Sequence, residues 1–546
     1  MKTMNNNQLS DDFYFSINSP IGYSKAPIQY YPNTSPTPKQ SPPLELPAKS
    51  PSPQLLTFDK LPIELIVQVI SKLSQFEILN LCRVNKKLYQ LSYPKLFENI
   101  VVDSKFNIFD KEFTTIGVTY VNSSYNLKKF IRVINSHKGG DVFSFLCISL
   151  PEAIDIYDNH VFSELLEMFS NFVHLKRLVW LYDVFRFEFL YNLKRKDILS
   201  VLVLNIKSNS ISNERITTNL RFTNLTNFQI QPFYNAGYLE NIVDNMLINN
   251  DNSKLRVLGL TRHPELQANH GHPFDDTFSI RNVFERIEFS ELSVLSLNDI
   301  LVNENDAKLL VKSASLHRLS SLHLCRVIER STTSSFLMII GEHLKNLVNL
   351  ALDIEESMEH LPEFLSMIPI LSTLDITIRK QSSFETYSTV ITRHKRNLTK
   401  LSLELVNQED NLLNDVPDLF YLSLSRLTEL TSLRINSSNN SSQEPVGLLS
   451  LVATLANLEY LEVFGNQAGG MPNLGLDMIH PTVFDGWFKV QHVVFIYLRQ
   501  NKNLKYVKIN DCLFECDSEK YVVSPKDGID NWFNMNVRVN MMLYLT

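Results

Sequence analysis

The sequence has little cysteine, five residues in 546. An odd number of scattered cysteines cannot form a complete set of disulfides, and such usage is typical of reduced thiols in the cytosol or nucleus. Cys512 and Cys516 stand four residues apart, but no second pair matches them, which argues against a zinc site. The other cysteines are Cys82, Cys147 and Cys325.

Long apolar runs and an excess of positive charge are absent as well. No run approaches the ~18 apolar residues that a membrane span requires, and the polar start MKTMNNNQLSDD lacks the apolar centre of a secretory signal. The formal net charge of −6 argues against a nucleic-acid binder, which needs a clustered basic surface. We therefore expect a soluble protein of the cytoplasm, the nucleus or both, with no membrane or nucleic-acid partner.

The sequence also lacks a recognisable catalytic or cofactor motif. The stretch HGHPFDD has metal-ligand types at His270, His272, Asp275 and Asp276, but no third ordered ligand group accompanies it. GNQAGG at residues 465–470 has neither the lysine nor the strand–helix context of a phosphate loop. No nucleophile stands with a base in a pattern above chance. We expect a protein that is not an enzyme and that holds no metal or cofactor.

Residues 1–56 are poor in aliphatic side chains and rich in proline, as in YYPNTSPTPKQSPPLELPAKSPSPQ. Proline removes backbone donors and blocks helix and sheet ladders, so we expect a disordered or polyproline-like tail. An alternative interpretation is a cluster of phosphorylation sites for proline-directed kinases, because Ser or Thr precedes Pro at several steps. These steps lie at Ser19, Ser35, Thr37, Ser41, Ser50 and Ser52.

Apolar residues then recur at helical spacing over residues 57–100. Pro62 suits the first turn of a helix over residues 61–73, and Glu64 complements the positive helix N-terminus. A second short helix follows in FEILNLCRV, and Asn85 is placed to cap a third. Three short helices cannot bury so many aliphatic side chains among themselves, so we expect some of them to face a partner. The first helix carries one broad apolar stripe of Leu65, Ile66, Val69, Ile70 and Leu73.

This pattern, over residues 58 to about 98, resembles the F-box. That family is a short helical module that docks on the Skp-type adaptor of cullin–RING ubiquitin ligases. Two positions depart from the family, since Leu88 stands where it usually has tryptophan and Gln75 where it often has proline. The alternative interpretation is a three-helix cap for the rest of the chain. The matching residues are Leu61-Pro62, Glu64-Leu65, Ile70, Leu73, Ile78-Leu79, Val84 and Leu96-Phe97.

The resemblance implies partners and an interface. The implied partners are a Skp-type adaptor and, through it, cullin and RING subunits. The residues that the resemblance and the apolar spacing assign to adaptor binding are Leu61, Pro62, Leu65, Ile66, Ile70, Leu73, Ile78, Leu79 and Val84.

A six-residue signature, Leu-x-x-Leu-x-Leu or a close substitute, recurs thirteen times behind this module, mostly at intervals of 24 to 32 residues. A near-constant period of this kind indicates a repeat architecture. The copies begin at Phe143 (FSFLCI), Leu175, Leu199, Leu225, Leu255, Leu292, Leu319, Leu347, Leu371, Leu398, Leu430, Leu458 and Leu504.

The end of each signature alternates apolar and polar residues, which predicts a short strand with one buried face. Helical patterns lie between the copies, and strand–helix units of this length give parallel strands backed by helices. The repeats resemble the leucine-rich-repeat family. We therefore expect an α/β fold, with a curved leucine-rich-repeat solenoid over 101–516 and a C-terminal cap over 517–546.

An adaptor-docking module joined to a recognition array resembles a substrate receptor of an SCF-type ubiquitin ligase. Such a receptor makes no bonds itself, because it only raises the effective concentration of its target near the ubiquitin-loading enzyme. Two alternatives stay open, a non-degradative assembly that contains the adaptor and a non-catalytic leucine-rich-repeat scaffold. The sequence does not name the target protein.

The polar strand positions predict where that target binds. Asp353, Asp375 and Glu404 fall on adjacent strands, so they are expected to form an acidic patch on the inner surface of the curve. Such a patch would select a target segment that carries Lys or Arg. The alternative is a solvated strand face with no partner. The basic stretch RHKRNLTK at residues 393–400 is interpreted as another solvated face, with contact to an acidic partner as the alternative.

Overall fold

The computed structural model describes Phe58 and residues 61–526, with internal gaps. The predicted tail over residues 1–56 and its phosphorylation sites lie outside the described residues. So do residues 527–546 of the predicted cap, HGHPFDD at 270–276 and GNQAGG at 465–470. The internal gaps are 105–116, 137–140, 153, 213, 219, 234–235, 249–253, 263–279, 356–359, 379–383, 407–417, 437–445, 465–483, 510–511 and 520–521.

Four short helices begin the described chain. Ser74 and Glu77 start the second helix as a capping box, in which the Ser74 backbone N–H donates to Glu77 Oε2 at 2.7 Å. The Asn85 side chain accepts the backbone N–H of Leu88 at 2.9 Å, which confirms Asn85 as the cap of the third helix. The helices are α1 (Ile63–Ile70), α2 (Gln75–Leu81), α3 (Lys86–Ser92) and α4 (Lys95–Glu98).

The strands of the described residues form one sheet of eighteen. Consecutive strands from β3 to β16 pair in parallel, apart from the two-residue β9, which lies beside the second half of β10. The N-terminal edge has the order β2–β1–β3, and β17 and β18 close the other end in antiparallel pairing.

The strands are β1 (Asn99–Asp103), β2 (Thr119–Val121), β3 (Ser144–Ser149), β4 (Arg177–Trp180), β5 (Val201–Asn205), β6 (Asn227–Phe233), β7 (Val257–Arg262), β8 (Val294–Asn298), β9 (Leu301–Val302), β10 (Ser321–Glu329), β11 (Asn349–Glu355), β12 (Thr373–Ile378), β13 (Lys400–Leu405), β14 (Ser432–Asn436), β15 (Tyr460–Phe464), β16 (Tyr506–Ile509), β17 (Cys512–Asp517) and β18 (Val522–Lys526).

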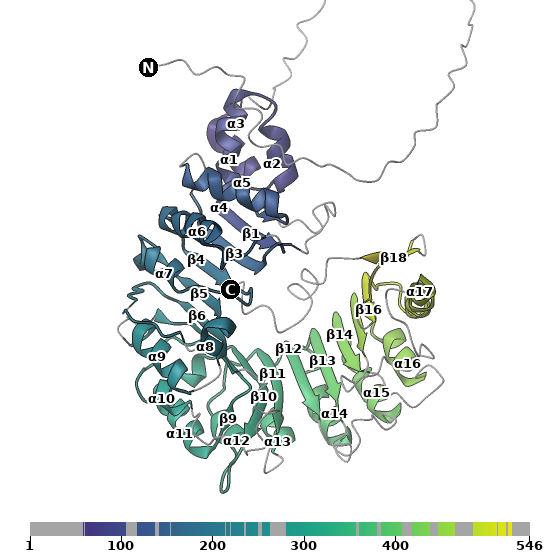
Figure 1. Ribbon diagram of the computed structural model, residues 1–546. Coiled ribbons are helices and arrows are strands. Elements are labelled where there is room, and N and C mark those ends of the chain that lie inside the picture. Colours follow the sequence, from purple (N-terminus) through teal and green to yellow (C-terminus); the bar gives the residue numbers. More distant parts are fainter. Residues whose placement is uncertain are drawn as a thin grey trace, which may run out of the picture.

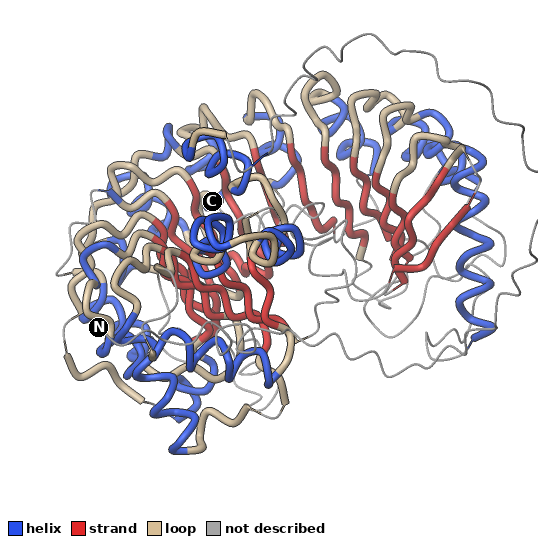
Figure 2. Tube along the Cα trace, turned by 90° about the horizontal axis from the view of Figure 1, so that it is seen from above, coloured by secondary structure: helices blue, strands red, loops and turns tan. Residues whose placement is uncertain are grey.

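The sheet bends into an arc with α1–α4 at one end and α17 and β18 at the other (Figure 1). Helices lie along the outer side of the arc, and the strands run side by side along its inner side (Figures 1 and 2). These helices are α5 (Ser124–Asn135), α6 (Asn159–Asn171), α7 (Glu188–Asn192), α9 (Ala236–Met246), α10 (Arg281–Phe284), α11 (Glu304–Ser313), α12 (Phe336–Gly341), α13 (Leu361–Met367), α14 (Phe384–Thr392), α15 (Asp418–Leu424), α16 (Val446–Thr454) and α17 (Phe484–Gln500). The short helix α8 (Lys207–Ser212) directly follows β5 and packs on β6 instead.

The signature leucines form the core between sheet and helices. In the copy that starts at Leu347, the side chains of Leu347, Leu350 and Leu352 are each at most 1% exposed. A fully buried leucine contributes about 2 kcal/mol of apolar burial. The same three positions are buried in every copy from Leu175 onward, and one continuous apolar cluster runs from Ile66 to Phe514.

One predicted copy is out of register by one residue. FSFLCI was expected to bury Phe143, Leu146 and Ile148. The structure instead buries Val142, Phe145 and Cys147, because Phe145 pairs with Leu178 of β4. A shift of one residue moves every side chain of a strand to the opposite face, so Leu146 and Ile148 lie on the inner face of the sheet.

Strands that carry no signature were not predicted. The segment NIVVD forms β1 directly after α4, so no linker separates the helical module from the sheet. At the other end of the sheet, β17 begins at Cys512 and runs antiparallel to both of its neighbours, β16 and β18.

Candidate functional site

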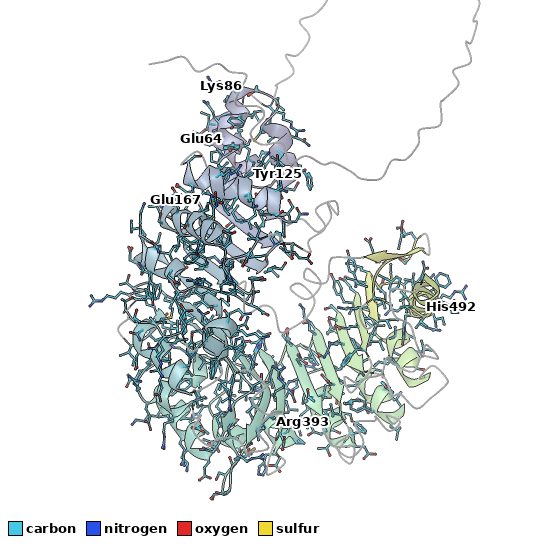
Figure 3. All side chains as sticks on the ribbon, in the orientation of Figure 1. Glu64, Lys86, Tyr125, Glu167, Arg393 and His492 are labelled. Atoms are coloured by element: carbon cyan, nitrogen blue, oxygen red, sulfur yellow. The ribbon has the colours of Figure 1, made fainter. Side chains whose placement is uncertain are left out.

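The first candidate site is the outer surface of the helical module at the end of the arc. Leu65 and Val69 of α1 are 46% and 40% exposed, and Pro62 is also exposed. Residues three or four positions apart lie on one face of a helix, so these three side chains form a single apolar strip. Glu64 lies on the same helix (Figure 3). Apolar side chains that share one helix face and stay exposed are typical of a surface that binds another protein.

The predicted adaptor-binding residues divide into three groups. Pro62, Leu65 and Val84 are exposed, and Leu61, Leu73 and Leu79 are half-buried. The remaining three pack inside the module, and their assignment to the adaptor interface stays a prediction. These are Ile66, Ile70 and Ile78, at most 2% exposed.

Sequence reasoning missed two exposed residues of the module. Ile63 is 53% exposed, and Val69, although recognised as part of the apolar stripe, was not assigned to the interface. The stripe is wide enough for one edge to enter the core and the other to face solvent. Periodicity alone does not tell which edge is which.

The second candidate site is the inner face of the sheet, where the three predicted acids lie. Asp375 pairs in register with Ala351 of β11 and with Ser402 of β13, and Glu404 pairs with Thr377 of β12. All three carboxylates therefore share the inner face, but Asp375 sits two residues earlier along its strand than the other two. The three acids therefore lie on three adjacent strands but do not stand level with one another. Asp353 and Glu404 are two strands apart, about 10 Å.

Glu404 also has a cationic neighbour inside the protein. Nη1 of Arg434 in β14 lies 3.9 Å from Glu404 Oε2, and Nε of Arg434 lies 3.6 Å from Glu462 Oε1 in β15. The guanidinium carbon is 3.8 Å from the ring centre of Phe464. Part of the predicted acidic patch is therefore neutralised within the sheet.

A separate apolar cluster occupies the inner face near the helical module. Val179, Val201 and Val203 are at most 5% exposed, and Leu146 and Leu181 pack against them. These valines stand at the positions between signature leucines, which were expected to be polar and solvated. The inner face is thus apolar over β3–β5 and charged over β12–β16.

Two titratable groups of the sheet, the imidazole of His323 and the thiol of Cys325, are held in their neutral forms. Burial lowers the pKa of His323 to about 4, and its Nε2 lies 2.9 Å from Ser321 Oγ. Burial, together with the carboxylates of Asp375 and Asp353, raises the pKa of the Cys325 thiol to about 12. At neutral pH this histidine and this thiol are uncharged, so the cysteine is a weak nucleophile.

In the described part of the chain, no three His, Cys, Asp or Glu side chains are arranged to hold a metal ion. No described helix combines the length and the apolar character needed to cross a membrane.

Comparison with known families identifies one domain. The family model of the F-box domain matches residues 58–97, which is the stretch that contains α1–α4 up to Phe97. The chain therefore carries an F-box domain, and an F-box domain indicates docking on a Skp-type adaptor. No curated protein matches the chain in a sequence comparison.

Proposed function

We propose that this protein is a substrate-recognition subunit of an SCF-type E3 ubiquitin ligase. The F-box domain docks on a Skp-type adaptor, which brings cullin and RING subunits, and the sheet behind it binds a target protein. The observation that carries the proposal is the F-box match at residues 58–97 in the same chain as a long parallel sheet.

The apolar strip on α1 supports the adaptor half of the proposal. Leu65 and Val69 are large apolar side chains that stay exposed, and their helix α1 belongs to the module at one end of the arc (Figure 1). Pro62 and Val84, both exposed, extend the candidate surface. The buried Ile66 and Ile70 act indirectly, because they fix α1 against the core and so hold the strip in place.

The target half rests on the repeat pattern. Thirteen signature copies and a sheet with helices on its outer side support a leucine-rich-repeat solenoid over residues 101–516, closed by a cap over 517–546. Its inner face carries both an apolar zone and the acids Asp353, Asp375 and Glu404, of which Glu404 is neutralised in part by Arg434. We assign target binding to this face.

The receptor acts by proximity and catalyses no step. It holds the target near the ubiquitin-loading enzyme, which converts a bimolecular encounter into one at high effective concentration. This role places the protein in the cytoplasm, the nucleus or both.

Affinity capture from cells with the proteasome inhibited tests the proposal. Wild-type protein should capture adaptor, cullin and a target that accumulates on inhibition, whereas a Leu61→Ala/Pro62→Ala variant should lose adaptor and cullin and keep the target. Adaptor without cullin would indicate a non-degradative assembly instead. Absence of the adaptor from the wild-type capture would indicate a scaffold whose helices only cap the sheet.

A further inference from the structure

Gln75, the first residue of α2, is a polar side chain buried inside the F-box domain, at 2% exposure. Both ends of its amide bind one residue of the sheet. The backbone N–H of Tyr120 donates to Gln75 Oε1 at 3.0 Å, and Gln75 Nε2 donates to the Tyr120 carbonyl at 3.4 Å. A buried amide whose donor and acceptor both have partners is a stabilising contact, whereas an unpaired one is costly.

Tyr120 is the middle residue of β2, the edge strand at this end of the sheet. Among the described residues, β2 pairs with β1 on one side. An edge strand leaves a row of unpaired N–H and C=O groups on its other side. In an antiparallel pair, two opposed residues exchange both of these bonds. The Gln75 amide makes the same two bonds to Tyr120, so it takes the place of a residue on a neighbouring strand.

Further contacts tie the same part of the F-box domain to the sheet. The backbone N–H of Gly117 donates to the carbonyl of Leu73 at 3.2 Å, just before α2. Gly117 has a φ of +71°, which favours glycine, and its carbonyl accepts Asn99 Nδ2 at 3.1 Å. At the C-terminal end of the module, the Phe97 ring of α4 stacks on Phe130 of α5 with centroids 6.2 Å apart.

We infer that Gln75 is a positioning residue that fixes the F-box domain to the edge of the sheet, so that the adaptor-docking strip and the target-binding face keep one relative orientation. The inference rests on the proposed function for its consequence. A receptor that works by proximity gains most when adaptor and target are held at a fixed separation. The α1–α2 connection, residues 71–74, is attached at both ends, by Gln75 to β2 and by α1 to the core.

The test uses the full chain and the variant Gln75→Met, which keeps the size of the side chain and removes both hydrogen bonds. The matched control is Gln90→Met, because Gln90 is an exposed glutamine of α3. Spin labels are introduced through unnatural amino acids at Lys86 of α3 and Glu167 of α6, both exposed and both visible in Figure 3. The native cysteines stay unlabelled.

Wild type and Gln90→Met should give one narrow distribution of label distances, and Gln75→Met should give a broadened or second distribution. The amide of Tyr120 should exchange about 2- to 10-fold faster in Gln75→Met, the effect of losing one hydrogen bond. A label-distance distribution unchanged by Gln75→Met overturns the positioning role, even if the Tyr120 amide exchanges faster.

Two further measurements keep the test decisive. If Gln75→Met does not fold, Gln75→Asn serves instead, because its amide is one methylene shorter and no longer reaches Tyr120. Fast exchange of the Tyr120 amide in wild type, as for an open edge, overturns the inference without any variant. Binding of purified Skp-type adaptor is measured on the same samples. An absence of adaptor binding by wild type counts against the proposed function and not against the positioning role of Gln75.

Discussion

Arg434→Met should destabilise the part of the sheet around β13–β15 by about 2–3 kcal/mol. Arg434 lies between Glu404 and Glu462, and the Glu462 side chain is only 4% exposed. Removing one member of a buried ion pair costs roughly 3–5 kcal/mol, because it leaves a buried charge unpaired. We reduce this figure because Arg434 and Glu404 are 19% and 21% exposed, and because Lys508 pairs in register with Glu462.

The cation–π contact with Phe464 is lost as well, whereas methionine keeps the apolar stem of the side chain. Native-state hydrogen exchange of the β14 amides measures the local effect, and a change of about 2 kcal/mol corresponds to exchange roughly 30-fold faster. Urea unfolding of the full chain gives the global effect.

Lys505→Met is the matched control. Lys505 Nζ lies 2.8 Å from Glu459 Oε1, closer than either contact of Arg434, but the two side chains are 58% and 35% exposed. A surface ion pair of this kind contributes about 0–1 kcal/mol. If Arg434→Met changes β14 exchange no more than Lys505→Met does, burial does not set the strength of these pairs and the reasoning is refuted.

Three other predictions concern acid stability, target capture and the tail. The pKa of His323 is lowered to about 4 by burial, so below about pH 6.5 the unfolded chain binds a proton that the folded chain does not. The free energy of unfolding should therefore fall between pH 6.5 and 4, by up to about 3 kcal/mol. Urea titrations of His323→Gln should show a smaller fall, and an equal fall would contradict the assignment. Changing Asp353, Asp375 and Glu404 together to their amides should weaken salt-sensitive capture of the target severalfold while adaptor binding stays intact, and unchanged capture would place recognition elsewhere on the sheet. Deleting residues 1–50 should leave the melting temperature within about 2 °C of wild type, because a disordered tail would contribute little buried area. A clear drop would show that the tail packs on the folded part.

Local, periodic features of the sequence predicted much of the fold. The leucines at the first, fourth and sixth signature positions, such as Leu347, Leu350 and Leu352, identified the strands because a buried strand face repeats every second residue. Asn85 was predicted as a cap because a helix N-terminus needs a side-chain acceptor within three residues. The F-box pattern, which the family comparison matches at residues 58–97, is likewise a short run of helical spacing.

Features that depend on distant partners were not predictable in this way. The register of β3 is set by the pairing of Phe145 with Leu178. Because this strand has apolar residues on both faces, matching it to the signature placed its buried residues one position too late. The neutralisation of Glu404 needs Arg434 from the next strand, and the burial of Gln75 needs Tyr120, 45 residues later in the chain. Periodicity along one segment carries no information about such contacts.

The affinity of the purified Skp-type adaptor for the full chain tests the central claim most directly. Leu65→Ala/Val69→Ala removes the apolar strip of α1, and Leu419→Ala/Leu422→Ala removes a comparable exposed pair from α15, where Leu419 and Leu422 are 63% and 65% exposed. Burying two half-exposed side chains at an interface contributes about 1 kcal/mol each, so the α1 variant should bind roughly 30-fold more weakly by calorimetry and the α15 variant as wild type does. Equal affinities of all three proteins, or no binding by wild type, would contradict the claim that this F-box domain docks the adaptor through α1.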